Sequence, residues 1–352
     1  MKFLQFITLQ YSTIICTLIL ILGTAPPAYS RRNINNAIKY DNLQNVVSKT
    51  IIVDKSGHGT FTTVQQAIDS VPDNNQLWIL IHVKTGIYNE QVSIQQGKQF
   101  IVLEGESSRT TVISWEAGGS VTESAAFTML ADNFVARNIT FKNTYNHAIT
   151  RDEGNHNMTW APAAIIAADK VSFYSCGFIS LQDTLFDARG RHYFRSCYIE
   201  GAVDFIWGNG QSFFQACYIK VTASVLGQGG TAYITAQGRE SESESTGFVF
   251  HSSAIIGTGP AFLGRAYRNH SRVVYYNTHM DNIIAPLGWD AWFNVGHEGL
   301  LTFAEAKCYG AGAHTSARVK WEKQLPIQEL RKLIHVNHFL NQDGWIEKQP
   351  PS

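Results

Sequence analysis

Three similar segments follow one another in the middle of the chain: Phe173-Tyr174-Ser175-Cys176-Gly177-Phe178-Ile179, Tyr193-Phe194-Arg195-Ser196-Cys197-Tyr198-Ile199 and Phe213-Phe214-Gln215-Ala216-Cys217-Tyr218-Ile219. Their cysteines are 21 and 20 residues apart. A fixed period near twenty, without a helix-length apolar stripe inside it, indicates one coil of a parallel β-solenoid per repeat. We therefore predict an all-β fold, a parallel β-helix whose coils stack about 4.8 Å apart. The three cysteines should lie stacked inside it.

An aspartate lies seven residues after each of the first two cysteines, at Asp183 and Asp204. If the coils are in register, these aspartates lie on one face, about 5 Å apart at the backbone. Two carboxylates that close cannot both ionise freely, so one pKa rises and one group keeps a proton. Aspartate is also common in turns. Because apolar residues follow both aspartates, we favour a functional pair over two exposed turns.

The composition is that of an ordinary globular protein. The 352 residues are 44% hydrophobic, with 28 basic and 28 acidic side chains. The even balance argues against a nucleic-acid partner and provides no strong attraction to an acidic polymer.

The first 30 residues resemble a secretory signal peptide. Lys2 is the only charge, residues 14–22 are largely apolar, and Ala28-Tyr29-Ser30 offers small residues for cleavage. The alternative is a membrane anchor, for which the apolar stretch is too short. No later stretch is long enough to span a membrane, so we expect no membrane contact once the signal is removed.

Four cysteines remain after the signal peptide: Cys176, Cys197, Cys217 and Cys308. Secretion permits disulfides, but their pairing cannot be deduced from the sequence. The first three lie beside aromatic residues, where a buried thiol is a small apolar filler. Zinc-binding spacing is absent. His147 and His156 lie in a polar stretch, residues 143–159, that we expect to be a surface loop, and we expect no metal site.

The two aspartates lie in recognisable sequence blocks. Gln182-Asp183-Thr184-Leu185 and Val203-Asp204-Phe205-Ile206-Trp207-Gly208 resemble two signature blocks of the plant pectin methylesterases, with Trp207 where the family usually has Phe. Three further blocks occur in the family order: Gly86-Ile87-Tyr88-Asn89-Glu90, Ile234-Thr235-Ala236-Gln237-Gly238-Arg239 and Leu263-Gly264-Arg265. The resemblance extends over about residues 49–345.

This resemblance implies a right-handed parallel β-helix and the short class of the family, which lacks the inhibitor-like pro-domain. Residues 1–30 would be the signal, 31–48 a short polar segment and 49–352 the catalytic domain. Helical spacing at residues 63–70 predicts a cap over the first coil. Residues 301–346 are expected to become helical, with an amphipathic helix at 327–334 packed outside the solenoid.

The resemblance also implies an aspartyl esterase that cleaves the C6 methyl esters of galacturonate in pectin, without metal or cofactor. Asp204, held ionised by Arg265, would be the nucleophile. Gln182 would donate to the oxyanion, while Asp183 would protonate methanol and then activate water. The implied partners are methyl-esterified homogalacturonan and a proteinaceous pectinesterase inhibitor. We expect a secreted monomer in the cell wall, with glycosylation triplets at Asn138, Asn157 and Asn269; Asn138 falls in a predicted strand and is a poor acceptor.

Three aromatic residues are candidates for substrate binding. Trp160 stands where the family has a second oxyanion glutamine, so its indole would donate that hydrogen bond or shape the cleft. Tyr267 replaces a family tryptophan and can stack on a sugar face. Trp289 is a second stacking candidate, with core packing as the alternative reading. Glu90, by contrast, is expected to be a structural carboxylate.

Two other functions remain open. The Trp160 change could leave a pectin-binding wall protein without activity. Another β-helix polysaccharide enzyme, such as a calcium-dependent pectate lyase or a glycosidase, is the second alternative.

Overall fold

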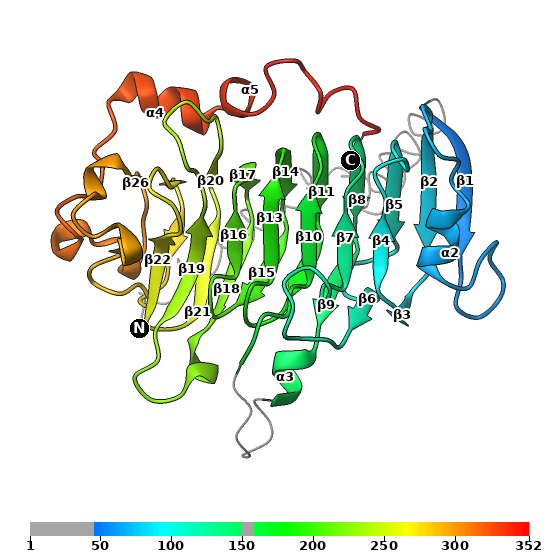
Figure 1. Ribbon diagram of the computed structural model, residues 1–352, viewed down its shortest axis with the longest axis horizontal. Helices are drawn as coiled ribbons and strands as arrows, with labels where there is room; N and C mark the ends of the chain where they lie inside the picture. The colour runs from blue at the N-terminus through cyan, green and yellow to red at the C-terminus, as the bar shows by residue number, and fades with distance from the viewer. Residues whose placement is uncertain (1–45, 150–157, 352) are drawn as a thin grey trace, which may run out of the picture. The chain divides into compact units, whose positions relative to one another are not determined.

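The computed structural model describes residues 46–149 and 158–351, and from Val47 to Pro350 the chain forms one compact unit. Its strands belong to three sheets in which every pair of neighbouring strands is parallel. Figure 1 shows the coils stacked from β1 to β26. The predicted right-handed parallel β-helix is confirmed.

Eight coils contribute one strand to each of three sheets, named A, B and C, and β1 and β26 extend sheet A at its two ends. Sheet A has ten strands: β1 (Val47–Val53), β2 (Trp78–Val83), β5 (Ile101–Gly105), β8 (Phe134–Arg137), β11 (Val171–Tyr174), β14 (Arg191–Arg195), β17 (Gln211–Gln215), β20 (Gly247–His251), β23 (Arg272–Tyr276) and β26 (Thr302–Ala306). Sheet B has eight: β3 (Gly86–Asn89), β6 (Thr111–Trp115), β9 (Thr140–Asn143), β12 (Gly177–Ile179), β15 (Tyr198–Gly201), β18 (Tyr218–Thr222), β21 (Ala254–Thr258) and β24 (His279–Met280). Sheet C also has eight: β4 (Val92–Ile94), β7 (Phe127–Met129), β10 (Ala164–Ala167), β13 (Leu185–Arg189), β16 (Ile206–Gly208), β19 (Ala232–Gln237), β22 (Ala261–Ala266) and β25 (Trp289–Asp290).

The repeated aromatic residues form a ladder inside the β-helix. Phe173 and Phe194 stack with ring centroids 5.0 Å apart, and Phe194 stacks on Phe214 at 4.6 Å. The ladder continues through Phe250 to Tyr275, at 4.5 and 4.6 Å. These spacings match the distance between neighbouring strands, because the same side chain recurs in each coil. The sequence period is therefore the packing period of the core.

As predicted, the corner between sheets A and B holds three buried cysteines, Cys176, Cys197 and Cys217. The thiol of Cys197 donates to the carbonyl of Phe173, and that of Cys217 to the carbonyl of Phe194. Ser253 and Thr278 make the equivalent bond further along the solenoid. All four cysteines that the structure describes are free thiols, so this column acts through packing and hydrogen bonds to the neighbouring coil.

The residue before each of these positions turns the chain at a positive φ, as at Ser175 (53°) and Ser196 (55°). Asn138 occupies the same corner one coil earlier, with φ 52°, between β8 and β9. The expectation that Asn138 lies within a strand is therefore wrong: asparagine tolerates the left-handed conformation, and the corner needs it. Asn269 lies in an exposed turn, and Asn157 is outside the described residues.

A short helix, α2 (Val64–Asp69), closes the first coil, as the sequence predicts. Val64 and Ile68 are buried against the core of the β-helix. The Glu90 carboxylate accepts hydrogen bonds from the backbone N–H groups of Val64 and Gln65, at 2.8 and 2.9 Å. Glu90 is thus a structural carboxylate that caps the first turn of this helix.

Two further predicted segments differ from expectation. The stretch 143–159 is not all loop, because Asn143 ends β9 and Tyr145–Ile149 forms α3, while His156 lies outside the described residues. Residues 301–346 are not all helical, because β26 pairs with β23 at the edge of sheet A. The described residues also form five short 3-10 helices: η1 (Ala223–Leu226), η2 (Trp292–Asn294), η3 (Glu298–Leu300), η4 (Ala311–Ala313) and η5 (Thr315–Ala317).

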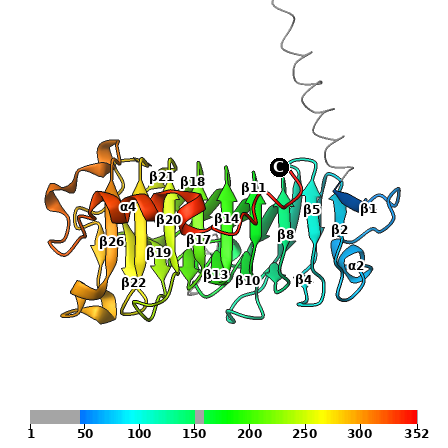
Figure 2. The same ribbon diagram turned by 90° about the horizontal axis from the view of Figure 1, so that it is seen from above.

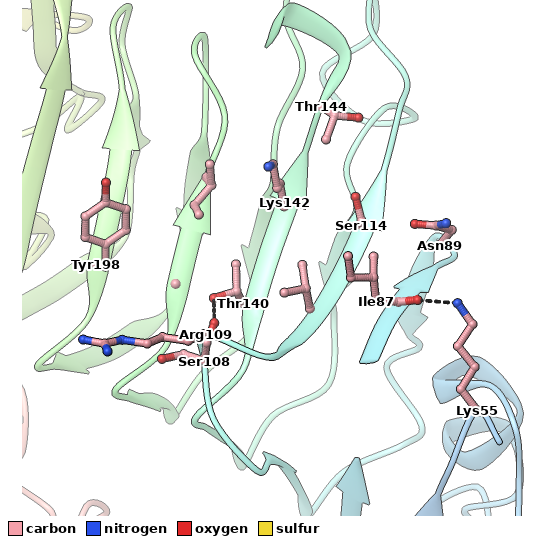
Figure 3. A pocket seen from close by; sticks show the side chains of 13 residues that line it. Lys55, Ile87, Asn89, Ser108, Arg109, Ser114, Thr140, Lys142, Thr144 and Tyr198 are labelled. Atoms are coloured by element: carbon pink, nitrogen blue, oxygen red, sulfur yellow. Dashed lines mark hydrogen bonds between the residues drawn. The ribbon is translucent and has the colours of Figure 1, made fainter. Parts of the chain in front are cut away.

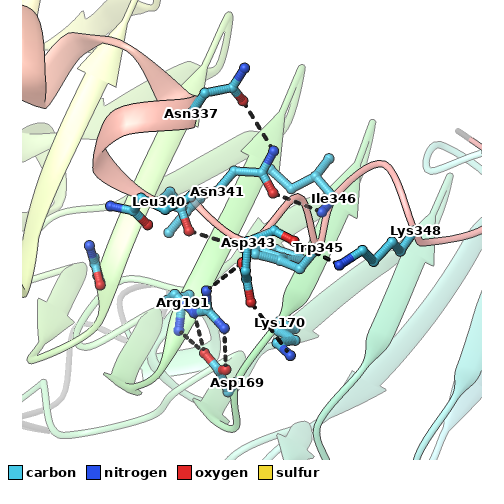
Figure 4. A network of polar contacts seen from close by, with 12 residues as sticks. Asp169, Lys170, Arg191, Asn337, Leu340, Asn341, Asp343, Trp345, Ile346 and Lys348 are labelled. Atoms are coloured by element: carbon cyan, nitrogen blue, oxygen red, sulfur yellow. Dashed lines mark hydrogen bonds and ion pairs between the residues drawn. The ribbon is translucent and has the colours of Figure 1, made fainter.

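The C-terminal helices α4 (Ile327–Ile334) and α5 (Val336–Phe339) lie outside sheet A, as predicted (Figure 2). Leu330 and Leu333 pack with Phe213 and Val249 of the sheet's outer face. The chain beyond α5 is tied to the same sheet by ion pairs (Figure 4). Arg191 contacts Asp169 at 2.7 Å and Asp343 at 2.9 Å. The tail therefore covers apolar surface that the solenoid would otherwise expose.

The predicted signal peptide, residues 1–30, lies outside the described residues. In the part of the chain that is described, no helix is long and apolar enough to cross a membrane. Sheet A begins at Val47, two residues before the predicted start of the catalytic domain.

Candidate active site

Asp183 and Asp204 lie side by side at the corner between sheets B and C. Gln182 pairs with Val203 in a parallel bridge, and the N–H of Asp183 donates to the carbonyl of Val203 at 3.0 Å. Both aspartates have positive φ, 60° and 47°. Aspartate adopts this conformation more readily than most residues. The register thus places the two carboxylates one coil apart, as the spacing predicts.

Arg265 holds Asp204 through two parallel contacts. Its Nε donates to Oδ1 at 2.7 Å, and its Nη2 donates to Oδ2. Arg265 is on β22, two strands beyond β16, and Ala236 stands between it and Trp207 in the ladder. Because the alanine side chain is small, the Arg265 side chain can extend across this strand to Asp204. The bidentate pair fixes the orientation of the Asp204 carboxylate.

The two carboxyl groups differ in their cation partners. Burial and the neighbouring Asp204 raise the pKa of Asp183 to about 8, while Arg265 opposes the change. Burial also raises the pKa of Asp204 from its ordinary value, and the hydrogen bonds and charge of Arg265 act against that rise. At neutral pH the proton therefore resides on Asp183. The carboxylate beside Arg265 is the one that ionises first.

A family model described as Pectinesterase matches residues 50–343. This chain belongs to the pectinesterase family. Probable pectinesterase 29 of Arabidopsis thaliana is 48% identical over 305 residues, which cover 87% of this chain and 91% of the relative.

Solved structures of the family are similar as well. The pectin methylesterase from carrot is 30% identical with a TM-score of 0.77, over 84% of this chain and 94% of that one. A pectin methylesterase mutant solved in complex with a hexasaccharide is 26% identical with a TM-score of 0.70, over 82% of this chain and 96% of that one.

In this pectinesterase an aromatic residue follows each aspartate by three positions, and the two residues pair across neighbouring strands of sheet C. Trp207, where the family usually has Phe, stacks on Phe186 with ring centroids 3.7 Å apart. Tyr267 meets Trp207 edge-on, with ring centroids 6.0 Å apart. Its role in binding a sugar stays a prediction.

The prediction for Trp289 is wrong. Its side chain is only 1% exposed and stacks on Phe303 at 4.7 Å in the interior. No face of the ring is available to a sugar. The alternative considered from the sequence, core packing, is the role that the structure gives this tryptophan.

Trp292, three residues later, lies at the site instead. Its ring centroid is 3.8 Å from the Arg265 guanidinium, and that of Tyr233 is 4.4 Å from the same group. Two aromatic rings near the guanidinium group restrain its position, while its N–H groups remain free to donate to Asp204. Sequence reasoning missed both residues, although Trp292 follows Trp289 closely enough to have been weighed as an alternative.

Gln182 and Trp160 lie in neighbouring coils. Ser180 donates to the carbonyl of Ala161 at 2.7 Å, which places the segment containing Trp160 beside the turn that contains Gln182. The Trp160 side chain is 49% exposed. The oxyanion role of Gln182 and the two readings of Trp160 stay predictions. Within the described residues, no cluster of three or more metal-ligating side chains occurs.

Proposed function

We propose that this pectinesterase removes methyl esters from galacturonate units of pectin, with Asp204 as nucleophile and Asp183 as acid and base. One observation carries the proposal. Two adjacent carboxyl groups, the buried Asp183 and the partly buried Asp204, have different partners, since Arg265 binds Asp204 while Asp183 has a pKa of about 8. A nucleophile must be ionised and a general acid must be protonated at the same pH, and this arrangement supplies both.

The reaction would proceed in two steps. An oxygen of Asp204 attacks the C6 carbonyl carbon, and the tetrahedral intermediate collapses as Asp183 transfers its proton to the departing methoxy oxygen. Methanol leaves, and an acyl-enzyme anhydride remains on Asp204. Water then attacks the acyl carbon and gives a proton to Asp183. The products are a galacturonic acid unit and the original Asp204 carboxylate.

The negative charge that develops on the carbonyl oxygen needs hydrogen-bond donors. The side-chain amide of Gln182 is our candidate because the residue directly precedes Asp183. Trp160 is the candidate for a second donor. Tyr267 and Trp207 offer aromatic faces to the sugar units beside the cleaved ester. The esterase solved with a hexasaccharide supports a polysaccharide as substrate for the family.

The cellular part of the proposal rests on sequence and family. Cleavage after the first 30 residues would release the enzyme to the cell wall, where a monomer would act on methyl-esterified homogalacturonan. Asn269 begins an acceptor triplet and lies in an exposed turn, so a glycan would be accommodated there. A proteinaceous pectinesterase inhibitor is the expected protein partner.

Methanol release from highly methylated pectin by the secreted protein is the decisive assay. We expect methanol and new carboxylates in equal amounts, with no new reducing ends and no calcium dependence. New reducing ends would indicate a glycosidase, and calcium-dependent unsaturated products a lyase. Pectin binding without methanol at any pH would indicate a binding protein.

A further inference from the structure

A groove of about 1110 Å³ lies on sheet B, away from the carboxylate pair. Its floor is formed by outward-facing residues of β3, β6, β9, β12 and β15. None of Asp183, Asp204 and Arg265 lines it. Five strands spaced about 4.8 Å apart make a surface that an extended polymer can cross.

The charge of the groove is one-sided in an otherwise neutral chain. Lys55, Arg109 and Lys142 line it, and none of its lining residues is acidic. Figure 3 shows these cations on separate parts of the groove, with Lys55 near Ile87 and Arg109 extending to the side where Tyr198 lies. The three come from the loop after β1, the turn before β6 and β9 itself. The groove therefore favours a ligand with several spaced negative charges.

The cations are available to a ligand. Among the described residues, the side chains of Arg109 and Lys142 have neither an ion pair nor a hydrogen bond. Lys55 uses one N–H on the carbonyl of Ile87, at 2.7 Å, and keeps two. Thr140 donates to the carbonyl of Ser108 at 2.7 Å, which holds the turn that bears Arg109. A positioned turn presents its guanidinium at less entropic cost than a loose one.

The rest of the lining suits a sugar. It combines neutral hydrogen-bonding groups with a few apolar side chains, and Ile87 is 56% exposed. The neutral polar residues are Asn89, Ser108, Ser114, Thr140, Thr144 and Tyr198. A pyranose ring has both hydroxyl groups and apolar C–H faces. The carboxylate of Glu200, on the strand of Tyr198, is occupied by the Tyr198 hydroxyl and faces His147 at 3.8 Å.

We propose that this groove is a second, non-catalytic binding site for de-esterified galacturonan, the acidic product of the esterase. The inference rests on the proposed function, which generates this polymer. A methylated chain carries the hydroxyls but lacks the charges, so the groove would retain the enzyme on wall regions that it has already processed. The active-site corner would then remain close to the neighbouring methylated units.

The test compares two charge-matched double variants of the secreted protein. Arg109→Gln with Lys142→Gln should weaken binding of long de-esterified galacturonan by about fivefold, since two exposed ion pairs are lost. The loss should shrink at high salt. Arg331→Gln with Lys332→Gln, on the exposed side of α4, changes the net charge equally and should leave binding unchanged. Methanol release from a short methylated oligomer should be the same in all three proteins.

Three outcomes would contradict the proposal that this groove binds de-esterified galacturonan. Unchanged affinity in the Arg109 and Lys142 variant would do so, as would an equal loss in the Arg331 and Lys332 control. Equally tight binding of polyglutamate would show a general anion surface instead of a sugar site. Failure of the proposed function is distinguishable, because a wild-type protein without methanol release can still be measured for binding.

Discussion

Two aspartates four residues apart in the same coil, Asp183 and Asp187, have different surroundings, and our proposal gives them different functions. Asp183 lies at the corner between sheets, beside Asp204 and without a cation of its own. Asp187 lies on β13 with its side chain inside the β-helix, fully buried against His192. Burial disfavours the charged imidazole, yet Asp187 and the carbonyl of Ala168 raise the pKa of His192 overall.

The difference shows how a solenoid separates chemistry from stability. Inside, the buried carboxyl group of Asp187 contacts the imidazole of His192, and the pair is internal structure. At the corner between sheets B and C, Arg265 binds Asp204, and the neighbouring Asp183 keeps its proton. In our proposal, one residue type therefore serves as a reactive acid or as a structural side chain according to the partner within reach.

The largest expected effect is on the nucleophile. Asp204→Asn should lower kcat on the order of 10⁴-fold, because an amide of equal size cannot attack the ester. The variant should still fold, with a lower melting temperature than the wild type because Arg265 loses its charged partner. Methanol release and thermal unfolding measure the two quantities. Near-normal turnover in this variant would refute the assigned role.

Asp183→Asn should reduce kcat by about 10²- to 10⁴-fold through loss of the acid and base. It should also stabilise the protein. The ordinary aspartate pKa of 3.8 is raised to about 8 in the fold, so the native state binds the extra proton between these values. Its contribution to stability then falls as pH rises through this range, and the asparagine removes that loss. Melting temperatures at pH 5 and pH 9 test this; a variant less stable than wild type at pH 9 would contradict it.

The same pair predicts a bell-shaped pH profile for the wild type. Activity should fall as pH rises through about 8, where Asp183 loses its proton. Activity should also fall at acidic pH, where Asp204 becomes protonated. Because the pKa of Asp204 is raised, this fall should occur at a higher pH than for an ordinary aspartate. Initial rates of methanol release between pH 4 and pH 10 measure both limbs. Constant activity from pH 7 to pH 10 would exclude Asp183 as the acid.

Asp187→Asn should act on stability instead of chemistry. Removing one member of a buried ion pair should lower the free energy of unfolding by about 3 kcal/mol. Well below the lowered melting temperature, kcat should remain within a few-fold of the wild type. Denaturant unfolding and methanol release separate the effects. A loss of kcat like that of Asp183→Asn, in a folded protein, would erase the distinction between the two aspartates.

The smallest expected effect concerns Trp160. If its indole N–H donates to the oxyanion, Trp160→Phe should lower kcat with little change in KM. If the ring stacks on a sugar, the same change should be mild and appear in KM. Trp160→Gln restores the family residue and should raise kcat where a donor was missing. Steady-state kinetics on one pectin preparation distinguish these cases.

The sequence by itself determined the repeat and everything that follows from register. The period near twenty predicted the stacked cysteines and the adjacency of Asp183 and Asp204, because residues one period apart become neighbours in a parallel β-helix. The helical cap and the outer helix followed from apolar spacing. The family blocks indicated Arg265 as the partner of Asp204, and the structure places it there.

Only the tertiary structure decided which side chains face inward and which contacts cross more than one coil. Trp289 lies on β25 and is buried, whereas Trp292 has φ 49° and its ring lies beside Arg265. Asn138 lies at a corner between two strands, although the surrounding sequence predicts one continuous strand. The cationic groove combines a loop, a turn and a strand from separate coils. The direction in which a side chain points depends on local turns. A contact that crosses a whole coil depends on the size of the residue between, such as Ala236. The sequence period alone predicts neither.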